Sequence, residues 1–236
     1  MNLYQQFIAK SRYARFLDDK NRREHWDETV QRYFDFMTEH LKERCDYTLT
    51  VELRNELELA VLNLEVMPSM RLMQFAGDPA RKCNTCGYNC TFIAPGCLED
   101  FAEIMYLSMQ GCGVGFSVES QNVEQMPQIQ KHTTKMSLTH VVGDSKEGWC
   151  DALTLGLKTW FAGQDITFDY SQIRLAGERL NTMGGKASGP EPLRSLLDFA
   201  KEKIQKRQGL RLRPIDVHDI ICKIGECVVA GGVRRS

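Results

Sequence analysis

The sequence lacks an excess of charge of either sign. Its 236 residues include 30 Lys and Arg against 31 Asp and Glu, which leaves a formal net charge of −1. A protein that attracts nucleic acid or an anionic membrane through its overall field carries a clear positive excess. The composition therefore favours neither a nucleic-acid partner nor an anionic membrane, and any site for a polyanion has to be local.

Long hydrophobic runs are also missing. No stretch approaches the roughly 18 apolar residues that cross a bilayer. The N-terminal segment MNLYQQFIAKSRYARF has no apolar core of the kind found in signal peptides. With 42% hydrophobic residues, the chain still has enough apolar side chains for a sizeable core. We therefore expect a globular, cytoplasmic protein without a membrane partner.

No repeat, low-complexity tract or linker rich in Pro, Gly and Ser divides the sequence, but cysteine is abundant, with nine residues. An odd number of cysteines in a chain without an export signal argues against a secreted disulfide framework. We expect most of them to be thiols that are buried as small apolar residues.

Hydrophobic periodicity predicts helices in the first third of the chain. Residues 27–45 begin with acidic side chains and end in Lys and Arg, as helices do. Residues 50–66 read the same way, with Thr50 as the N-terminal cap. The predicted apolar face of this second helix comprises Leu53, Leu57, Ala60, Val61 and Leu64. We assign residues 1–66 to an N-terminal helical region.

From residue 89 onward, short apolar runs alternate with helical patterns. The predicted strands are residues 89–94, 113–119 and 165–170. The predicted helices are residues 98–111, residues 144–161 with Asp144 or Ser145 as cap, a helix from Pro190 or Pro192, and residues 214–230. This alternation indicates an α/β fold with parallel strands, in which active sites gather at the carboxyl ends of strands.

The segment CNTCGYNCTF, residues 83–92, places three cysteines within eight positions. Cys83 and Cys86 have the spacing of half a zinc site, whose other ligands would be Cys90, Cys97 or a histidine. A redox dithiol is a second interpretation, although the strand and helix that flank a thioredoxin motif are missing. In a third, Cys90 is a buried strand cysteine, so the spacing alone leaves all three open.

A basic segment, KEKIQKRQGLRLR, spans residues 201–213 and contains six Lys and Arg residues. Such a run on a helical pattern is typical of a solvated helix face rather than of a nucleic-acid site.

Eight motifs occur in unbroken order along the chain: SRYARF (11–16), WDETVQR (26–32), MPSMRLMQFAG (67–77), NCTF (89–92), GCGVGFSVE (111–119), GDSKEGWCDAL (143–153), GGKASGPEPL (184–193) and AGGVRRS (230–236). Together they resemble the N-terminal half of a ribonucleotide reductase, most strongly the adenosylcobalamin-dependent (class II) ribonucleoside-triphosphate reductases. The resemblance implies an α/β fold with N-terminal helices followed by the first half of a ten-stranded α/β barrel. Residues 67–236 would form that half and end inside an active-site and specificity loop.

The resemblance also implies a radical reaction that converts ribonucleotides to 2′-deoxyribonucleotides. In that family a thiyl radical takes hydrogen from C3′, the 2′-hydroxyl leaves as water, and a cysteine pair supplies a proton and two electrons. By motif, Cys90 resembles the member of the redox pair that protonates the leaving hydroxyl. The implied cofactor is adenosylcobalamin, and the implied reductant is of the thioredoxin type.

Further positions resemble the substrate site of the family. Ser69, Asn89 and Gly113 match residues that line it, although a helix-cap serine and a β-bulge glycine are equally compatible with the local sequence. Arg234 and Arg235 match a loop between a specificity effector and the substrate base, where their planar side chains would contact phosphate or base. Their alternative is two arginines that face solvent after a helix end.

A glycine pair followed by a lysine forms a possible phosphate loop. Gly184, Gly185 and Lys186 would approach phosphate in a turn, or would form only a flexible connection to Pro190.

The radical cysteine and the second redox cysteine of the family pattern would lie beyond Ser236. We therefore expect a complementary C-terminal half as partner, with the chain being either a truncated or a split enzyme. The alternatives are a noncatalytic nucleotide- or zinc-binding module on the same scaffold, and a large-subunit fragment of an oxygen-dependent reductase.

Overall fold

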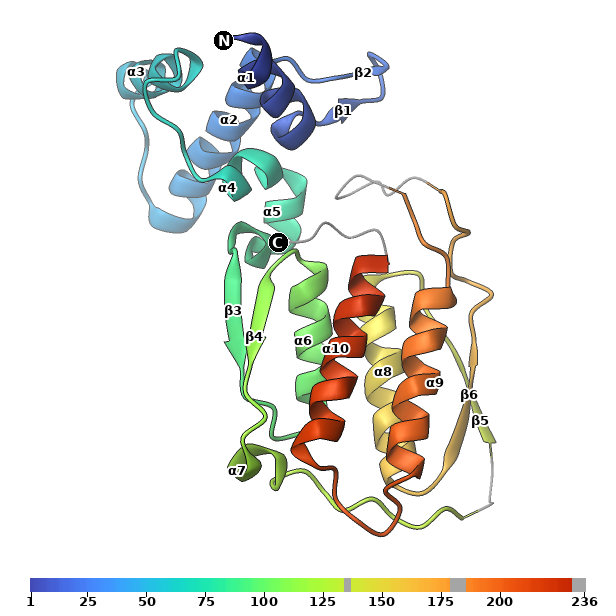
Figure 1. The fold of residues 1–236 in the computed structure, drawn as a ribbon. Helices are drawn as coiled ribbons and strands as arrows, with labels where there is room; N and C mark the ends of the chain where they lie inside the picture. The colour runs from blue at the N-terminus through green and yellow to red at the C-terminus, as the bar shows by residue number, and fades with distance from the viewer. Residues whose placement is uncertain (134–136, 179–185, 231–236) are drawn as a thin grey trace. The chain divides into compact units, whose positions relative to one another are not determined.

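The computed structural model describes residues 1–133, 137–178 and 186–230. These residues form two compact units, of which one is Met1–Tyr88 and the other is the described chain from Asn89 onward. Figure 1 labels the elements of both units.

The first unit is mainly helical. Its elements are α1 (Leu3–Ile8), a π-helical turn (Ala9–Tyr13), β1 (Phe16–Leu17), β2 (Arg22–Arg23), α2 (Trp26–Cys45), α3 (Val51–Leu62), α4 (Met70–Phe75), α5 (Asp78–Lys82) and a 3₁₀ turn (Asn84–Gly87). The helix predicted over 27–45 is confirmed as α2. Its first turn is fixed by the Glu28 carboxylate, which accepts a hydrogen bond from the His25 backbone N–H at 2.8 Å.

The second predicted helix is confirmed as α3, but it is shorter than expected. Thr50 caps it, since the Leu53 backbone N–H donates to the Thr50 hydroxyl at 3.3 Å. The helix ends at Leu62 because Leu64 adopts a left-handed φ of +63°. Only Val61 of the predicted apolar face is buried, whereas Leu53 is 36% exposed. Leu64, which was predicted on the same face, lies beyond the end of the helix.

Two small apolar clusters hold the first unit together. One contains Ala9, Tyr13, Val30, Phe34, Val61 and Met73. The other contains Phe36, Phe75, Ala76, Ala80 and Cys86. Both clusters join α2 to the segment around α4 and α5, and each fully buried large side chain contributes roughly 1.5–3 kcal/mol to folding.

The second unit alternates strands and helices. Its elements are β3 (Cys90–Ile93), α6 (Glu99–Met109), β4 (Gly113–Phe116), α7 (Ser120–Val123), β5 (Ser137–Val141), α8 (Lys146–Phe161), β6 (Asp165–Asp169), α9 (Glu191–Gln205) and α10 (Pro214–Ala230). The predicted strands are confirmed as β3, β4 and β6, and the four predicted helices as α6, α8, α9 and α10. The sequence did not predict β5, because its apolar residues Leu138 and Val141 do not alternate.

The strands form two parallel pairs, as the alternation predicted. Strand β3 pairs with β4, and α6 connects them. Strand β5 pairs with β6, and α8 connects them. Parallel neighbours require such a crossover, so the second unit contains two βαβ segments.

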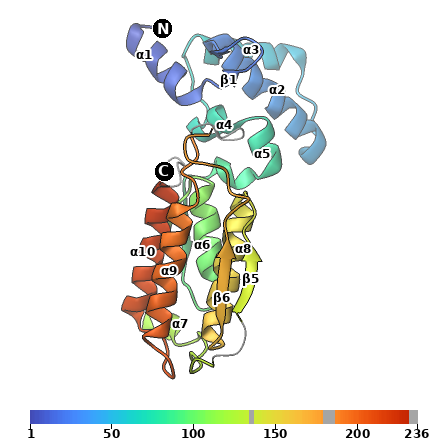
Figure 2. The same cartoon turned by 90° about the vertical axis from the view of Figure 1, so that its right-hand side faces the viewer.

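The four long helices lie side by side between the two strand pairs (Figures 1 and 2). They share one hydrophobic core, to which all four contribute fully buried side chains. Examples are Phe101 of α6, Leu153 of α8, Leu196 of α9 and Ile220 of α10. Strand residues Ile93, Val114 and Phe116 pack against the same core.

Of the two residues predicted as the cap of α8, Asp144 and Ser145, the structure shows Ser145 in this role. Its hydroxyl accepts a hydrogen bond from the Gly148 backbone N–H at 2.9 Å. Asp144 instead pairs with Arg174, at 2.7 Å between carboxylate and guanidinium.

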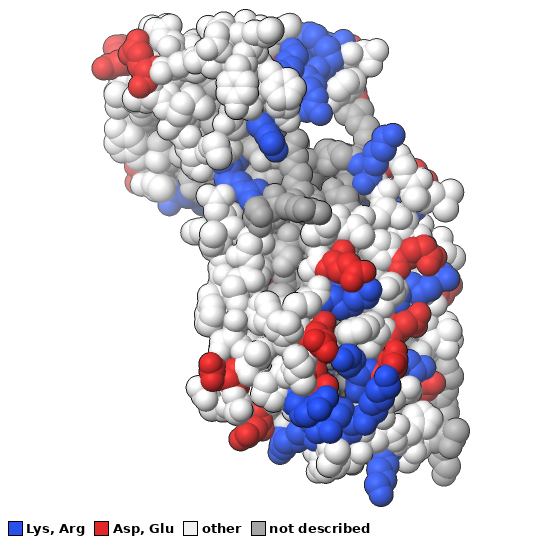
Figure 3. Space-filling view, viewed as in Figure 1, with Lys and Arg blue, Asp and Glu red and all other residues white. Residues whose placement is uncertain are grey.

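The basic segment after residue 200 lies at the end of α9 and in the turn that follows. Figure 3 shows its Lys and Arg side chains interspersed with Asp and Glu over the face formed by α9 and α10. Lys203 binds Asp219 at 2.5 Å, and Arg213 binds Asp216 at 2.9 Å. The segment is thus a solvated face with internal ion pairs, as its composition predicted.

None of the helices within the described ranges is long and apolar enough to cross a membrane.

Candidate functional site

Cys90 and Gly113 open two neighbouring parallel strands. Cys90 is the first residue of β3, and it lies opposite Gly113, the first residue of β4. The Gly113 backbone N–H donates to the Asn89 carbonyl at 2.8 Å, which fixes this end of the ladder. Three predicted site residues, Asn89, Cys90 and Gly113, are therefore brought together.

This location differs from the one that the fold class predicts for an active site. Active sites in parallel α/β folds commonly lie at the carboxyl ends of the strands. Cys90 and Gly113 instead lie at the amino ends of β3 and β4. Gly111, with a left-handed φ of +91°, follows α6 and turns the chain into this end of β4.

The side chain of Cys90 lies on the face of β3 that is turned away from the core. Successive residues of a strand point to opposite faces. Ile93, three positions after Cys90, packs on the core, whereas Phe92, on the Cys90 face, is 64% exposed. Cys90 is itself exposed, so its thiol is accessible to a substrate or to another part of a protein. The interpretation of Cys90 as a buried strand cysteine is wrong.

Ser69 belongs to the first unit, where it precedes α4. It occupies the N-cap position, yet its side chain makes no capping hydrogen bond, and the residue is exposed. The alternative role of a helix-capping serine is therefore not realised.

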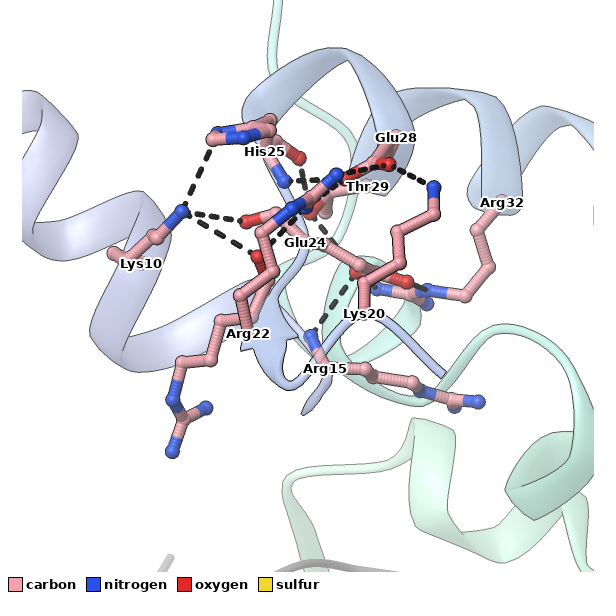
Figure 4. A network of polar contacts seen from close by, with 10 residues as sticks. Lys10, Arg15, Lys20, Arg22, Glu24, His25, Glu28, Thr29 and Arg32 are labelled. Carbon is pink, nitrogen blue, oxygen red and sulfur yellow. Dashed lines mark hydrogen bonds and ion pairs between the residues drawn. The ribbon is translucent and has the colours of Figure 1, made fainter. Parts of the chain in front are cut away.

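A polar network that the sequence did not predict surrounds Glu24 and Arg32 (Figure 4). Arg32 donates to Glu24 at 2.8 Å and to the backbone carbonyls of Tyr13 at 3.1 Å, Met73 at 3.1 Å and Ala76 at 3.0 Å. Glu24 is only 4% exposed and also accepts from the Arg15 backbone N–H at 3.0 Å.

This network explains why three of the motifs occur together. Arg32 comes from WDETVQR, Tyr13 from SRYARF, and Met73 and Ala76 from MPSMRLMQFAG. One guanidinium therefore binds the backbone within α4 and at its end, and joins it to Tyr13. Because Arg32 belongs to a motif, its role could have been suspected from the sequence. No local pattern distinguishes Glu24 from other acidic residues.

The other predicted positions fall on or near residues that are not described. Lys186 is exposed, beside the short backbone contact in which Ala187 donates to the Glu178 carbonyl at 2.7 Å. Gly184, Gly185, Arg234 and Arg235 lie outside the described residues.

Cys83 and Cys86 are the residues on which the zinc-site interpretation depends. Cys86 is 1% exposed and packs in the apolar cluster with Phe36 and Phe75. Over the described part of the chain, no three His, Cys, Asp or Glu side chains are grouped as metal ligands. Burial among apolar side chains accounts for Cys86 without a metal.

The chain is similar to known ribonucleotide reductases in sequence and in fold. Residues 114–203 match the family model described as B12-dependent ribonucleotide reductase, insertion domain. A crystal structure of a B12-dependent (class II) ribonucleotide reductase superposes with a TM-score of 0.81 at 27% identity, over 96% of this chain and 40% of that chain.

Curated relatives agree with the structural match. The adenosylcobalamin-dependent ribonucleoside-triphosphate reductases of Lactobacillus gasseri and Lactobacillus leichmannii are 29% and 31% identical, each over 96% of this chain and 39% of the relative. The enzyme of the same name from Euglena gracilis is 31% identical over 95% of this chain and 33% of the relative. The chain thus spans less than two-fifths of the length of these relatives.

The helical first unit and the two βαβ segments are therefore those of the ribonucleotide reductase scaffold, which confirms the fold class expected from the motifs. Within that scaffold, the chain corresponds to the N-terminal part of the class II, B12-dependent reductases. The comparisons name this branch rather than the oxygen-dependent one.

Proposed function

We propose that the chain is the N-terminal portion of a ribonucleotide reductase that converts ribonucleotides to 2′-deoxyribonucleotides. The observation that carries the proposal is the exposed Cys90 thiol at the start of β3, next to the backbone of Gly113. Its support is the match to class II reductases over 96% of the chain. A helical segment, residues 1–66, and a barrel segment, residues 67–236, are part of the same proposal.

Cys90 acts in this mechanism as one of two redox thiols. Its proton goes to the 2′-hydroxyl, which leaves as water. Its sulfur then forms a disulfide with a second cysteine, and the pair gives up two electrons to the sugar. Because Cys90 lies on the exposed face of β3, the second thiol and the ribose can both approach it.

Substrate contacts are proposed for residues on both sides of this thiol in the sequence. Asn89 and Gly113, whose backbone groups are hydrogen-bonded to each other, would line the ribose site, and Ser69 would offer its hydroxyl, which makes no capping hydrogen bond. Lys186 with Gly184 and Gly185 would approach phosphate. Arg234 and Arg235 would contact phosphate or base.

Adenosylcobalamin is the proposed cofactor, because the relatives are named for it. It supplies the radical that begins the reaction when it is bound. The charged groove between α9 and α10, about 410 Å³ and lined by Glu191, Arg194, Asp198, Phe199 and Lys223, does not fit a corrin. No step is therefore assigned to the cofactor from the described residues.

The proposed partners follow from the length of the relatives. A complementary C-terminal portion would supply the radical cysteine and the second redox cysteine, and a thioredoxin-type protein would reduce the resulting disulfide. A cytoplasmic location is proposed as well.

The test is nucleotide reduction by this chain together with the portion that completes it. With adenosylcobalamin, a dithiol and CTP or ATP, we expect deoxynucleotide formation that Cys90→Ser lowers by about 10³-fold or more, because one thiol cannot form the disulfide. Cys97→Ser is the matched control, since Cys97 is exposed seven positions later and lies outside the proposed site. Turnover that survives Cys90→Ser would remove Cys90 from the mechanism.

A further inference from the structure

A thiol and an imidazole are in contact on the outer face of α10. Cys222 is exposed, and His218 precedes it by one helical turn, so the two side chains share a face. The Cys222 sulfur lies 3.7 Å from Nε2 and 3.8 Å from Nδ1 of His218. A small rotation of either side chain would bring the thiol proton to a ring nitrogen.

A carboxylate also lies near the imidazole. Asp219 Oδ1 is 3.6 Å from His218 Nδ1, and Asp219 Oδ2 accepts a hydrogen bond from Lys203 Nζ at 2.5 Å. The Lys203 hydrogen bond, opposed by desolvation and helped by His218, holds the pKa of Asp219 below its usual range. A carboxylate that is bound to a lysine therefore lies beside the imidazole.

Other thiols in the chain have surroundings that oppose ionisation. Burial raises the pKa of Cys150 and Cys227 to about 12. Cys97 is exposed like Cys222, but desolvation and the neighbouring Asp100 raise the pKa of its thiol. An adjacent imidazole that can carry a positive charge is instead the setting of reactive cysteines.

We propose that Cys222 is a reactive thiol that undergoes exchange with small-molecule disulfides, with His218 as the proton acceptor and Asp219 as the group that stabilises the imidazolium. The site is separate from Cys90 and lies outside the proposed reductase chemistry. It would make the outer face of α10 a place of reversible S-thiolation.

The exchange is balanced without a further reactant. The Cys222 proton moves to His218, and the thiolate attacks one sulfur of the disulfide. A new disulfide forms between Cys222 and that sulfur while the old sulfur–sulfur bond breaks. The departing thiolate takes the proton from His218, so Cys222 is oxidised and one equivalent of small thiol is released.

Peptide-resolved mass spectrometry of the 236-residue chain with oxidised glutathione tests the proposal. We expect the adduct on Cys222 to form about three- to tenfold faster at pH 7 than the adduct on the exposed Cys45, because only Cys222 has an imidazole beside it that can take the thiol proton during the attack. His218→Gln should slow Cys222 by the same factor and leave Cys45 unchanged, and the buried Cys150 and Cys227 should stay unreacted, which shows that the chain is folded.

A second pair of variants separates the Asp219 effect from general surface charge. Asp219→Asn should slow Cys222 severalfold. Glu226→Gln is the matched control, since Glu226 is an acidic residue of the same helix that pairs with Lys223 at 2.7 Å. The proposal is overturned if Cys222 reacts no faster than Cys45, or if its rate is the same in the native chain and in His218→Gln.

Discussion

At the scale of single residues, Arg32 binds three backbone carbonyls of the first unit through one guanidinium. Its side chain is 14% exposed, and that of its partner Glu24 is 5% exposed. An ion pair this well buried is costly to break, because the remaining charge is left without a partner. The pair therefore fixes the segments around Tyr13 and Met73 more strongly than a surface salt bridge would.

Arg32→Met should destabilise the first unit by about 3–5 kcal/mol, since it leaves the Glu24 carboxylate buried and unpaired. Peptide-resolved hydrogen exchange measures this directly in α2 and α4 and separates them from the second unit. Protected amides of α2 should exchange about 10²- to 10³-fold faster.

Arg54→Met provides the comparison for this prediction. Arg54 pairs with Asp35, whose side chain is 55% exposed, so its loss should cost less than about 1 kcal/mol. Equal effects of the two substitutions would show that the Arg32 network does not hold the unit together.

At the scale of elements, the start of α8 depends on a close backbone approach. A Cβ atom at Gly148 would lie 2.5 Å from the Gly143 carbonyl oxygen. Neither partner can yield easily, because the Gly148 N–H is already bound to the capping Ser145. Both glycines belong to GDSKEGWCDAL, so backbone packing explains their presence in this motif.

Gly148→Ala should therefore destabilise the chain by about 1–3 kcal/mol, as an overpacked site does. The opposite is expected in α10, where a Cβ at Gly225 would contact nothing within 4 Å. Gly225→Ala should stabilise by about 0.5–1 kcal/mol through helix propensity. Urea unfolding of both variants checks the pair, and a stabilising Gly148→Ala would contradict the assigned contact.

At the scale of the whole molecule, two buried thiols make the free energy of unfolding decrease at alkaline pH. Burial raises the pKa of Cys150 and Cys227 from 9.0 to about 12. Between these values the unfolded chain releases protons that the folded chain keeps, so the free energy of unfolding falls as pH rises. The stabilisation that comes from keeping these two thiols neutral and buried is fully present below about pH 9, and it is lost as the pH rises toward 12.

At pH 10, each thiol should lower the free energy of unfolding by about 1.4 kcal/mol relative to pH 8. Urea unfolding at the two pH values measures the decline. The double variant Cys150→Ala/Cys227→Ala should show a decline smaller by about 3 kcal/mol, whereas Cys45→Ala, at an exposed thiol, is the control. An unchanged decline in the double variant would rule out these two thiols as its source.

Much of the second unit could be predicted from local sequence. Periodicity and caps placed α8 to α10 within a few residues, because the contacts that form a helix join residues three or four positions apart. The motif around Cys90 likewise identified the candidate thiol and the family. Strand β5 was not predicted because apolar and polar side chains do not alternate along it.

What the sequence by itself determined is thus the long helices, three of the strands of the second unit, the fold class and the residues that resemble a reductase site. Only the tertiary structure decided which of them meet. The Cys90–Gly113 pairing joins strands on either side of α6, and Arg32 reaches Ala76, 44 positions away. Such contacts depend on how the whole chain packs its apolar faces, which no window of a few residues encodes.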